Sequence, residues 1–169
     1  QEVLSILPVD KGANIAPNQY PELTVGGGYA FKGWFVGDTR INDANYPITQ
    51  DMTVIARIVR QTTVTYKSEA YDQDQIDAGD VNRTVNFPDD PTLAGANFDG
   101  WYDGSGVKVT APFTAAQDMT LTAHYTVDVT FVVKNADGNE VSRNIVTLGK
   151  GAVLDGTISA TETRHIDEN

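Results

Sequence analysis

Aspartates alternate with other residues in the segment 72–77, a spacing that is typical of calcium-binding loops. An EF-hand loop needs a glycine at its sixth position and a bidentate glutamate near its end. Here Asp77 stands at the sixth position, and Ile76 has no side chain that can bind a metal. The segment therefore favours a solvated hairpin over a calcium site, and we expect no metal and no other cofactor.

Asp99 and Asp103 lie close enough in the sequence to be considered as an acid and base pair. Aspartates are, however, also common in turns and at strand edges. The two histidines, His124 and His165, stand apart from each other. No nucleophile elbow, His-Glu-x-x-His motif or phosphate-binding glycine loop occurs in the sequence. We therefore expect that the protein is not an enzyme and has no catalytic residues.

Trp34 and Trp101 are the most attractive ligand-binding residues, because an exposed aromatic ring can stack on a sugar ring. With Asp99 and Asp103 they form a speculative ligand set, and a carbohydrate-binding module is the alternative function. A buried aromatic side chain removes about 150–250 Å² from water, and its loss costs about 3–5 kcal/mol. A small module cannot easily forgo that burial, so we favour a core role for both tryptophans.

Both tryptophans belong to an internal repeat. A Phe-x-Gly-Trp motif begins at Phe31 and again at Phe98, 67 residues later (98 − 31 = 67). The same offset relates residues 50–53 to residues 117–120, which both read Gln-Asp-Met-Thr. A repeat of this length is typical of an array of small modules. The positions that we expect to build the module cores are Phe31, Gly33, Trp34, Phe35, Met52, Phe98, Gly100, Trp101, Tyr102 and Met119.

The elements that must position these residues are strands. Apolar residues alternate with other residues in segments 52–58 and 119–125, which predicts two half-buried strands. Segments 62–67 and 129–134 are rich in β-branched and aromatic residues and are also predicted strands. The Asp-Gly pair in 135–139 predicts a hairpin turn. No helical period is sustained beyond a short turn near 18–23 and its copy at 88–94, so the predicted fold is mainly β with little helix.

Alternation along the Phe-x-Gly-Trp strand places Trp34 on the face opposite Phe31, Gly33 and Phe35. The glycines Gly33 and Gly100 permit a close backbone approach or a bulge at this point.

The repeat frame divides the chain into three segments. Residues 1–60 are repeat 1 without its first strand, residues 61–127 are a complete repeat 2, and residues 128–169 are the opening hairpin and tail of a truncated repeat 3. Lys-Gly at 150–151 aligns with Lys-Gly at 11–12, so a third Phe-x-Gly-Trp would begin at position 170 (31 + 151 − 12 = 170). We expect neighbouring repeats of the same parent chain to be partners.

Charge and composition exclude several classes of partner. The chain carries 23 acidic and 12 basic residues, a net charge of −11, which disfavours nucleic acid and anionic lipid. Cysteine is absent, so disulfides and thiolate metal sites are excluded. No apolar run is long enough to span a bilayer, and we expect no membrane insertion.

Two motifs at a fixed mutual spacing are each present twice: residues 28–35 with 51–56, and residues 98–102 with 118–123. They resemble the Listeria-Bacteroides repeat, the B-repeat type of internalin-like surface proteins, over nearly all of residues 9–133. Ala96 replaces the usual tyrosine of the family, and His124-Tyr125 replaces a frequent tryptophan.

This resemblance implies tandem small β-grasp-like modules in a secreted bacterial protein at the cell surface. It implies an extracellular, non-catalytic role as a stalk or spacer and as an adhesion segment. The partner would be a host or cell-surface protein or a glycan, and neither the resemblance nor the residues identify it.

Overall fold

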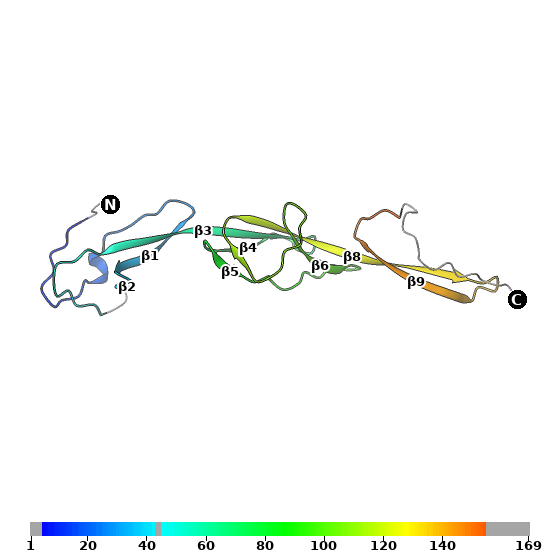
Figure 1. The fold of residues 1–169 in the computed structure, drawn as a ribbon, viewed down its shortest axis with the longest axis horizontal. Helices are drawn as coiled ribbons and strands as arrows, with labels where there is room; N and C mark the ends of the chain where they lie inside the picture. Colours follow the sequence, from blue (N-terminus) through cyan, green and yellow to red (C-terminus); the bar gives the residue numbers. More distant parts are fainter. Residues whose placement is uncertain (1–4, 43–44, 155–169) are drawn as a thin grey trace. The chain divides into compact units, whose positions relative to one another are not determined.

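The fold is mainly β, as the sequence predicts, in a computed structural model that describes residues 5–42 and 45–154 (Figure 1). The elements are η1 (a 3-10 turn, Pro17–Gln19), β1 (Tyr29–Val36), β2 (Thr39–Arg40), β3 (Ile55–Lys67), β4 (Gln75–Asp80), β5 (Arg83–Val85), β6 (Asn97–Tyr102), β7 (Phe113–Ala115), β8 (Met119–Lys134) and β9 (Glu140–Gly149). The turn η1 lies near the first expected helical turn, whereas residues 88–94 contain no helix. Within the described residues no helix is long and apolar enough to cross a membrane.

The chain forms two compact units. Unit 1 comprises Gln1–Thr63, Ala78–Arg83 and Ala115–Gln117, and unit 2 comprises Val64–Asp77, Thr84–Thr114 and Asp118–Asn169. Strand β3 has residues in both units. The three repeat segments inferred from the sequence follow a different division and stay a prediction.

Unit 1 is built on the antiparallel pair β1 and β3, in which Trp34 lies opposite Ala56 and Phe35 lies opposite Ile55. β2 turns back along the end of β1 and pairs Arg40 with Phe35. These strands are rich in the aromatic and β-branched residues that favour extended backbone.

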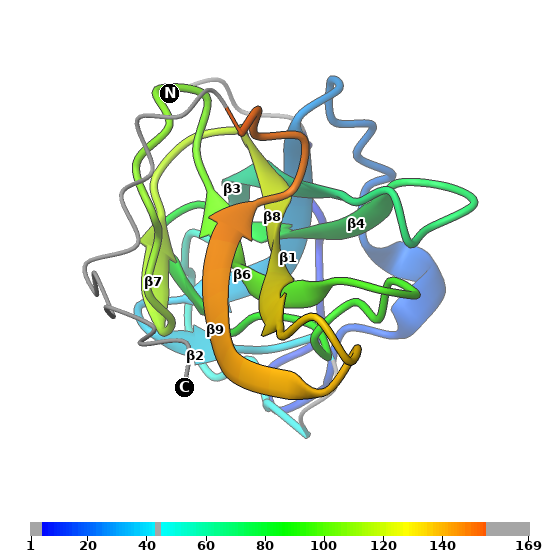
Figure 2. The same cartoon turned by 90° about the vertical axis from the view of Figure 1, so that its right-hand side faces the viewer.

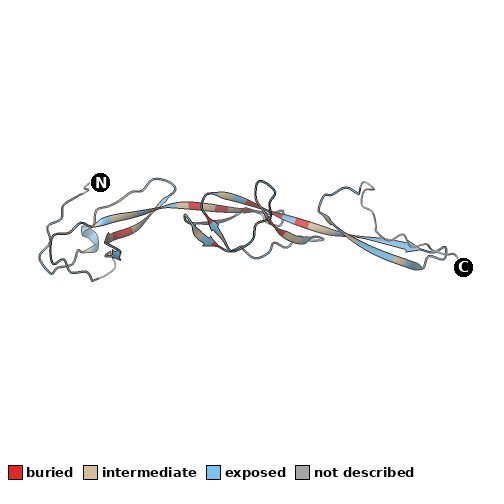
Figure 3. Ribbon diagram, in the orientation of Figure 1, coloured by how far each residue is buried: buried red, intermediate tan, exposed pale blue. Residues whose placement is uncertain are grey.

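Unit 2 has a parallel pair at its centre. Residues 64–67 of β3 run alongside residues 119–122 of β8, and β6 pairs antiparallel with β8. Leu121, Ala123 and Tyr125 are buried, while the residues between them are exposed, which confirms the half-buried strand predicted for 119–125. In Figure 3 buried residues gather along these strands.

The copy of this strand in repeat 1 begins later than predicted. Residues 52–54 are not in a strand, and β3 starts only at Ile55. In repeat 2 the matching residues pair with residues 64–67 of β3. The same apolar alternation therefore accompanies a strand in repeat 2 and none at residues 52–54.

The expected position of Phe31 opposite Trp34 is wrong because the strand is bulged between Phe31 and Gly33, whereas Gly33 and Phe35 lie on the face opposite Trp34 as expected. The registers of β1 and β6 shift between Phe31 and Gly33 and between Phe98 and Gly100, as the two glycines allow. The inserted residue, Lys32, puts Phe31 and Trp34 on the same face of the strand. The two rings pack edge to face, with 5.7 Å between their centroids. The bulge is therefore what gathers the aromatic residues of the motif.

The strands β8 and β9 form the hairpin predicted around Asp-Gly (Figure 2). The Asn135 N–H donates to the Asn139 carbonyl at 2.9 Å and closes the turn. Val129 lies opposite Val146, which places both side chains on the same face of the hairpin.

Candidate binding sites

Trp101 is fully buried in unit 2, with 0% of its surface exposed. Its ring packs edge-on against Tyr66 at 5.1 Å and against Phe98 at 5.6 Å. Trp34 is 6% exposed and stacks on Tyr20 at 6.4 Å. Neither indole offers an open face to a sugar ring, so sugar stacking on these two residues has no structural support.

The other expected core positions are either buried glycines or half-buried side chains. Gly33 and Gly100 are buried, and the half-buried positions are Phe31, Phe35, Met52, Phe98, Tyr102 and Met119. Both glycines have positive φ angles, +124° and +155°, where side chains are rare. A Cβ at Gly33 would lie 2.7 Å from Arg40 Nε, and one at Gly100 would overlap the Lys108 side chain. These glycines are therefore required by backbone conformation and by close packing.

Asp99 is held as an ionised carboxylate. It accepts a hydrogen bond from the Tyr102 hydroxyl at 2.5 Å and one from Lys108 Nζ at 3.1 Å. These donors lower the pKa of Asp99, and the same contact raises the pKa of Tyr102. A general acid needs the opposite shift, so this carboxylate is poorly suited to acid catalysis.

Asp103 shapes the turn that follows β6. Its Oδ1 accepts hydrogen bonds from the backbone N–H groups of Ser105 and Val107, both at 2.9 Å. This is the usual role of an aspartate at the start of a turn. Asp99 and Asp103 thus have separate partners, and the structure does not join them in one site.

The other residues that the sequence suggested for metal binding or catalysis lie at the surface. Asp74 of the acidic segment 72–77 lies 3.6 Å from Lys67. His124 is exposed and stacks on Tyr102 with 4.1 Å between ring centroids. Among the described residues no group of three or more histidines and carboxylates could hold a metal ion. His165 lies outside the described residues.

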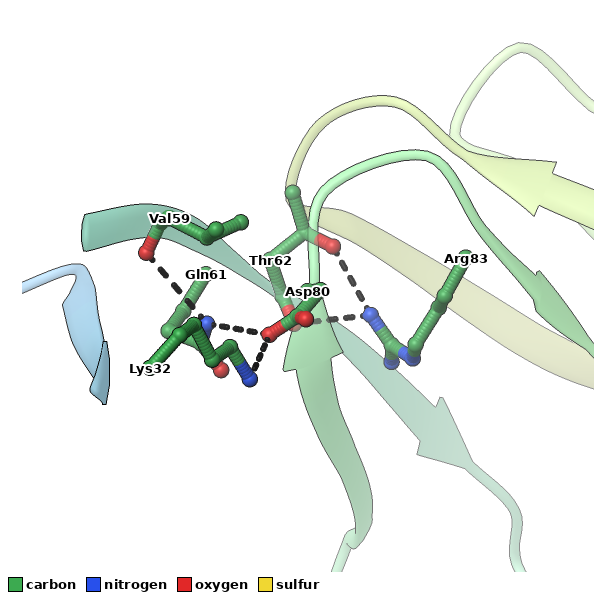
Figure 4. Close-up of polar contacts among 6 residues, drawn as sticks. All are labelled: Lys32, Val59, Gln61, Thr62, Asp80 and Arg83. Atoms are coloured by element: carbon green, nitrogen blue, oxygen red, sulfur yellow. Dashed lines mark hydrogen bonds and ion pairs between the residues drawn. The ribbon is translucent and has the colours of Figure 1, made fainter. Parts of the chain in front are cut away.

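A polar network around Asp80, which the sequence does not indicate, lies within unit 1 (Figure 4). Lys32 Nζ lies 2.6 Å from Asp80 Oδ1, and the Gln61 amide donates to the same oxygen at 2.7 Å. The Arg83 guanidinium donates to the carbonyl and hydroxyl oxygens of Thr62 at 3.0 and 2.8 Å. Lys32 stands at the bulged position beside Gly33, and no spacing rule links it to Asp80.

The contact between Lys32 and Asp80 in this network is an ion pair. Hydrogen bonds from Lys32 and Gln61 lower the pKa of Asp80, which favours its ionised form. Both side chains here are more than a third exposed, so water stabilises their charged forms.

Unit 1 also contains an open groove of about 810 Å³ beside Trp34. We call it the unit 1 groove; its lining includes residues 5–9 and residues 50–56. Of these lining residues, only Ile55 and Ala56 belong to a strand, β3.

A comparison with known protein families finds a match, which lies in the centre of the chain. Residues 63–124 match the family model of the Listeria-Bacteroides repeat domain. The matched range begins in β3 and ends in β8, and it contains the parallel pair and the Trp101 core. No curated protein sequence is significantly similar to the chain.

Proposed function

Because residues 63–124 are a Listeria-Bacteroides repeat, a repeat family of bacterial surface proteins, we propose that the chain is a tension-bearing, non-catalytic spacer. It would act outside the cell, in series with neighbouring repeats of its parent chain. The proposal includes a tandem β-grasp-like organisation of the modules. The observation that carries it is the parallel pairing of residues 64–67 with residues 119–122.

This pairing determines how repeat 2 would carry load. The chain enters the repeat through β3 and leaves it through β8, and the two strands are parallel neighbours. Tension pulls β3 toward its amino end and β8 toward its carboxyl end, so the strands are sheared along their length. All hydrogen bonds of a sheared ladder are loaded together, whereas those of a peeled ladder break one after another.

The side chains at this ladder add resistance to sliding. Val64 and Leu121 are fully buried, and Tyr66, which pairs with Leu121, packs on the buried Trp101. Sliding by one residue would turn each of these side chains to the opposite face of its strand. Shear therefore loads the core together with the hydrogen bonds.

Single-molecule force spectroscopy with two pairs of cysteine handles tests this function. The chain has no native cysteine, so attachment would be unambiguous. Handles at Arg60→Cys and Thr130→Cys shear the ladder, while handles at Gln73→Cys and Thr130→Cys peel it from one end. All three positions are exposed. We expect a clearly higher unfolding force for the shear pair at the same loading rate.

The unfolding event of repeat 2 can be identified by its length. Shear releases residues 64–122, 59 residues (122 − 64 + 1 = 59), which extend to about 200 Å. Equal forces in the two geometries would refute a load-bearing role, even if the repeat itself is stable.

Adhesion to a host or cell-surface protein or to a glycan stays a prediction. A glycan array and a pull-down from host-cell extract test it, with charge reversal of acidic surface residues of repeat 2 as the control. A spacer without adhesive function would bind nothing specifically. The buried tryptophans and the engaged Asp99 and Asp103 give no support to the carbohydrate alternative.

A further inference from the structure

Strand β4 has an edge that no other described strand covers, since it pairs only with β3. The Val81 N–H donates to the Arg60 carbonyl at 2.8 Å, which sets the phase of this pair. In an antiparallel pair the backbone groups of successive residues point alternately toward the neighbouring strand and away from it. The N–H and carbonyl of Ile76 therefore point away from β3, and no hydrogen bond from a described turn or loop reaches them. Such an edge is a template for a further strand.

A cavity of about 270 Å³ opens beside this edge, within unit 2. It is lined by Tyr66, by residues 75–77 of β4 and by residues 86–88. Tyr66 is 2% exposed, so it lies at the inner end, and its hydroxyl donates to the Asn86 carbonyl at 3.4 Å. Phe87 is held by packing on Phe113, with 5.9 Å between ring centroids. The cavity therefore combines a fixed aromatic lining with an unpaired strand edge.

The charge around the cavity is negative. Between Lys67 and Lys108 the only basic residue is Arg83, and its guanidinium donates to Thr62. Asp77 belongs to the lining, and the two residues that follow Pro88 are exposed aspartates. A second copy of this chain, with a net charge of −11, would be repelled here, whereas a cationic partner would be attracted.

We propose that this edge binds an extended cationic segment of another protein by β-strand addition. The segment would pair with β4 at Ile76 and extend the sheet by one strand. Alternate side chains of a strand point to opposite faces, so one set would enter the cavity. The other set would lie beside the Ile76 side chain, which is 68% exposed.

The two faces select different side chains. On the cavity side, Asp77 attracts a cation and Phe87 supplies an aromatic surface, on which a guanidinium stacks better than an ammonium group. On the other side, Ile76 supplies apolar surface for a β-branched side chain. The favoured segment therefore alternates arginine with valine or isoleucine. This inference does not rest on the spacer function, because it concerns a lateral contact that carries no load.

A nuclear magnetic resonance titration of the whole chain tests the proposal. The probe is a short synthetic peptide, blocked at both ends, that alternates arginine with valine. We expect saturable shifts centred on the Ile76 amide and a Kd of about 10 µM to 1 mM, typical of a weak specific contact. A peptide that alternates glutamate with valine should not bind.

N-methylation of the probe separates strand addition from charge attraction. Methyl groups on the amides of one edge of the arginine peptide remove its main-chain donors and leave its charge unchanged. The methylated peptide should bind at least about tenfold more weakly. Equal binding of the two peptides would overturn strand addition.

Two matched variants locate the site. Gln75 and Gln73 are both exposed, but only Gln75 lines the cavity. Gln75→Lys should weaken binding of the arginine peptide about tenfold, whereas Gln73→Lys, with the same change in net charge, should have a much smaller effect. Gln75→Glu should bind at least as tightly as the wild type, which keeps the test decisive if thermal unfolding shows that Gln75→Lys disturbs the fold.

The outcomes that would overturn the proposal are distinct. Absence of saturable binding up to about 1 mM peptide would exclude the site at the affinity expected for it. Equal weakening by Gln75→Lys and Gln73→Lys would show attraction to the whole acidic surface. Self-association of the chain without peptide, abolished by Gln75→Lys, would assign the edge to a second copy in place of a cationic partner.

Discussion

Replacement of Trp101 by alanine is expected to unfold repeat 2. The control variant is Trp34→Ala, which removes the matching tryptophan of repeat 1. Trp101 has no exposed surface and packs against Tyr66 and Phe98. Removing a buried tryptophan costs about 3–5 kcal/mol. At about 0.05–0.15 kcal/mol per residue, a 67-residue repeat has a stability of about 3–10 kcal/mol, so the loss is a large fraction of the total.

Trp34 holds the same position in repeat 1 but borders the unit 1 groove. Its removal widens an open groove and does not create a sealed void, so the cavity contribution to the loss is smaller. We expect Trp34→Ala to cost at least about 1 kcal/mol less than Trp101→Ala. For a domain of this size, a loss of 3 kcal/mol lowers the melting temperature by about 12 °C or more.

Thermal unfolding followed by fluorescence measures both variants, because each variant retains a single tryptophan as its probe. Trp34→Ala leaves the fully buried Trp101, which should resist quenching by iodide below the transition. A melting temperature that Trp101→Ala leaves unchanged would refute the core assignment. An equal or larger loss in Trp34→Ala would refute the reasoning about the open groove.

Two further substitutions test the local geometry. Gly100→Ala should destabilise repeat 2 by about 1–3 kcal/mol because of its positive φ and the overlap with Lys108, whereas Gly104→Ala, which has free space, should be nearly neutral in urea unfolding. Asp80→Asn tests the pKa of this group. Because folding lowers that pKa, the contribution of Asp80 to stability is present above about pH 4 and is lost as the pH falls through the folded-state pKa. The stability difference between wild type and Asp80→Asn should therefore shrink in acid, and a difference that does not depend on pH would contradict the pKa shift.

Repeat 2 was largely predictable because local pattern and tertiary environment agree there. Residues 119–125 alternate in the sequence and also in burial, since β3 and β6 flank them on both edges. The same pattern in residues 52–54 does not produce a strand, because pairing also requires a neighbour. An alternation of apolar residues therefore shows that a segment can form a strand, but the strand forms only where a neighbouring strand is available for hydrogen bonding.

Contacts between distant side chains were not predictable. The bulge at Lys32 brings Phe31 to the same face as Trp34, and two-residue periodicity cannot show an inserted residue. The ion pair of Lys32 with Asp80 joins residues 48 positions apart (80 − 32 = 48). Asp99 was noticed as an acid, but its partner Lys108 comes close only because the chain turns after Tyr102.

The unfolding force of repeat 2 tests the central claim most directly, because the spacer function depends on the parallel ladder between residues 64–67 and 119–122. With handles at Arg60→Cys and Thr130→Cys, the account expects a single high-force event that releases about 200 Å of chain. It also expects a lower force when the first handle is moved to Gln73→Cys. Forces that do not depend on the pulling direction would contradict the claim that this repeat is built to carry tension.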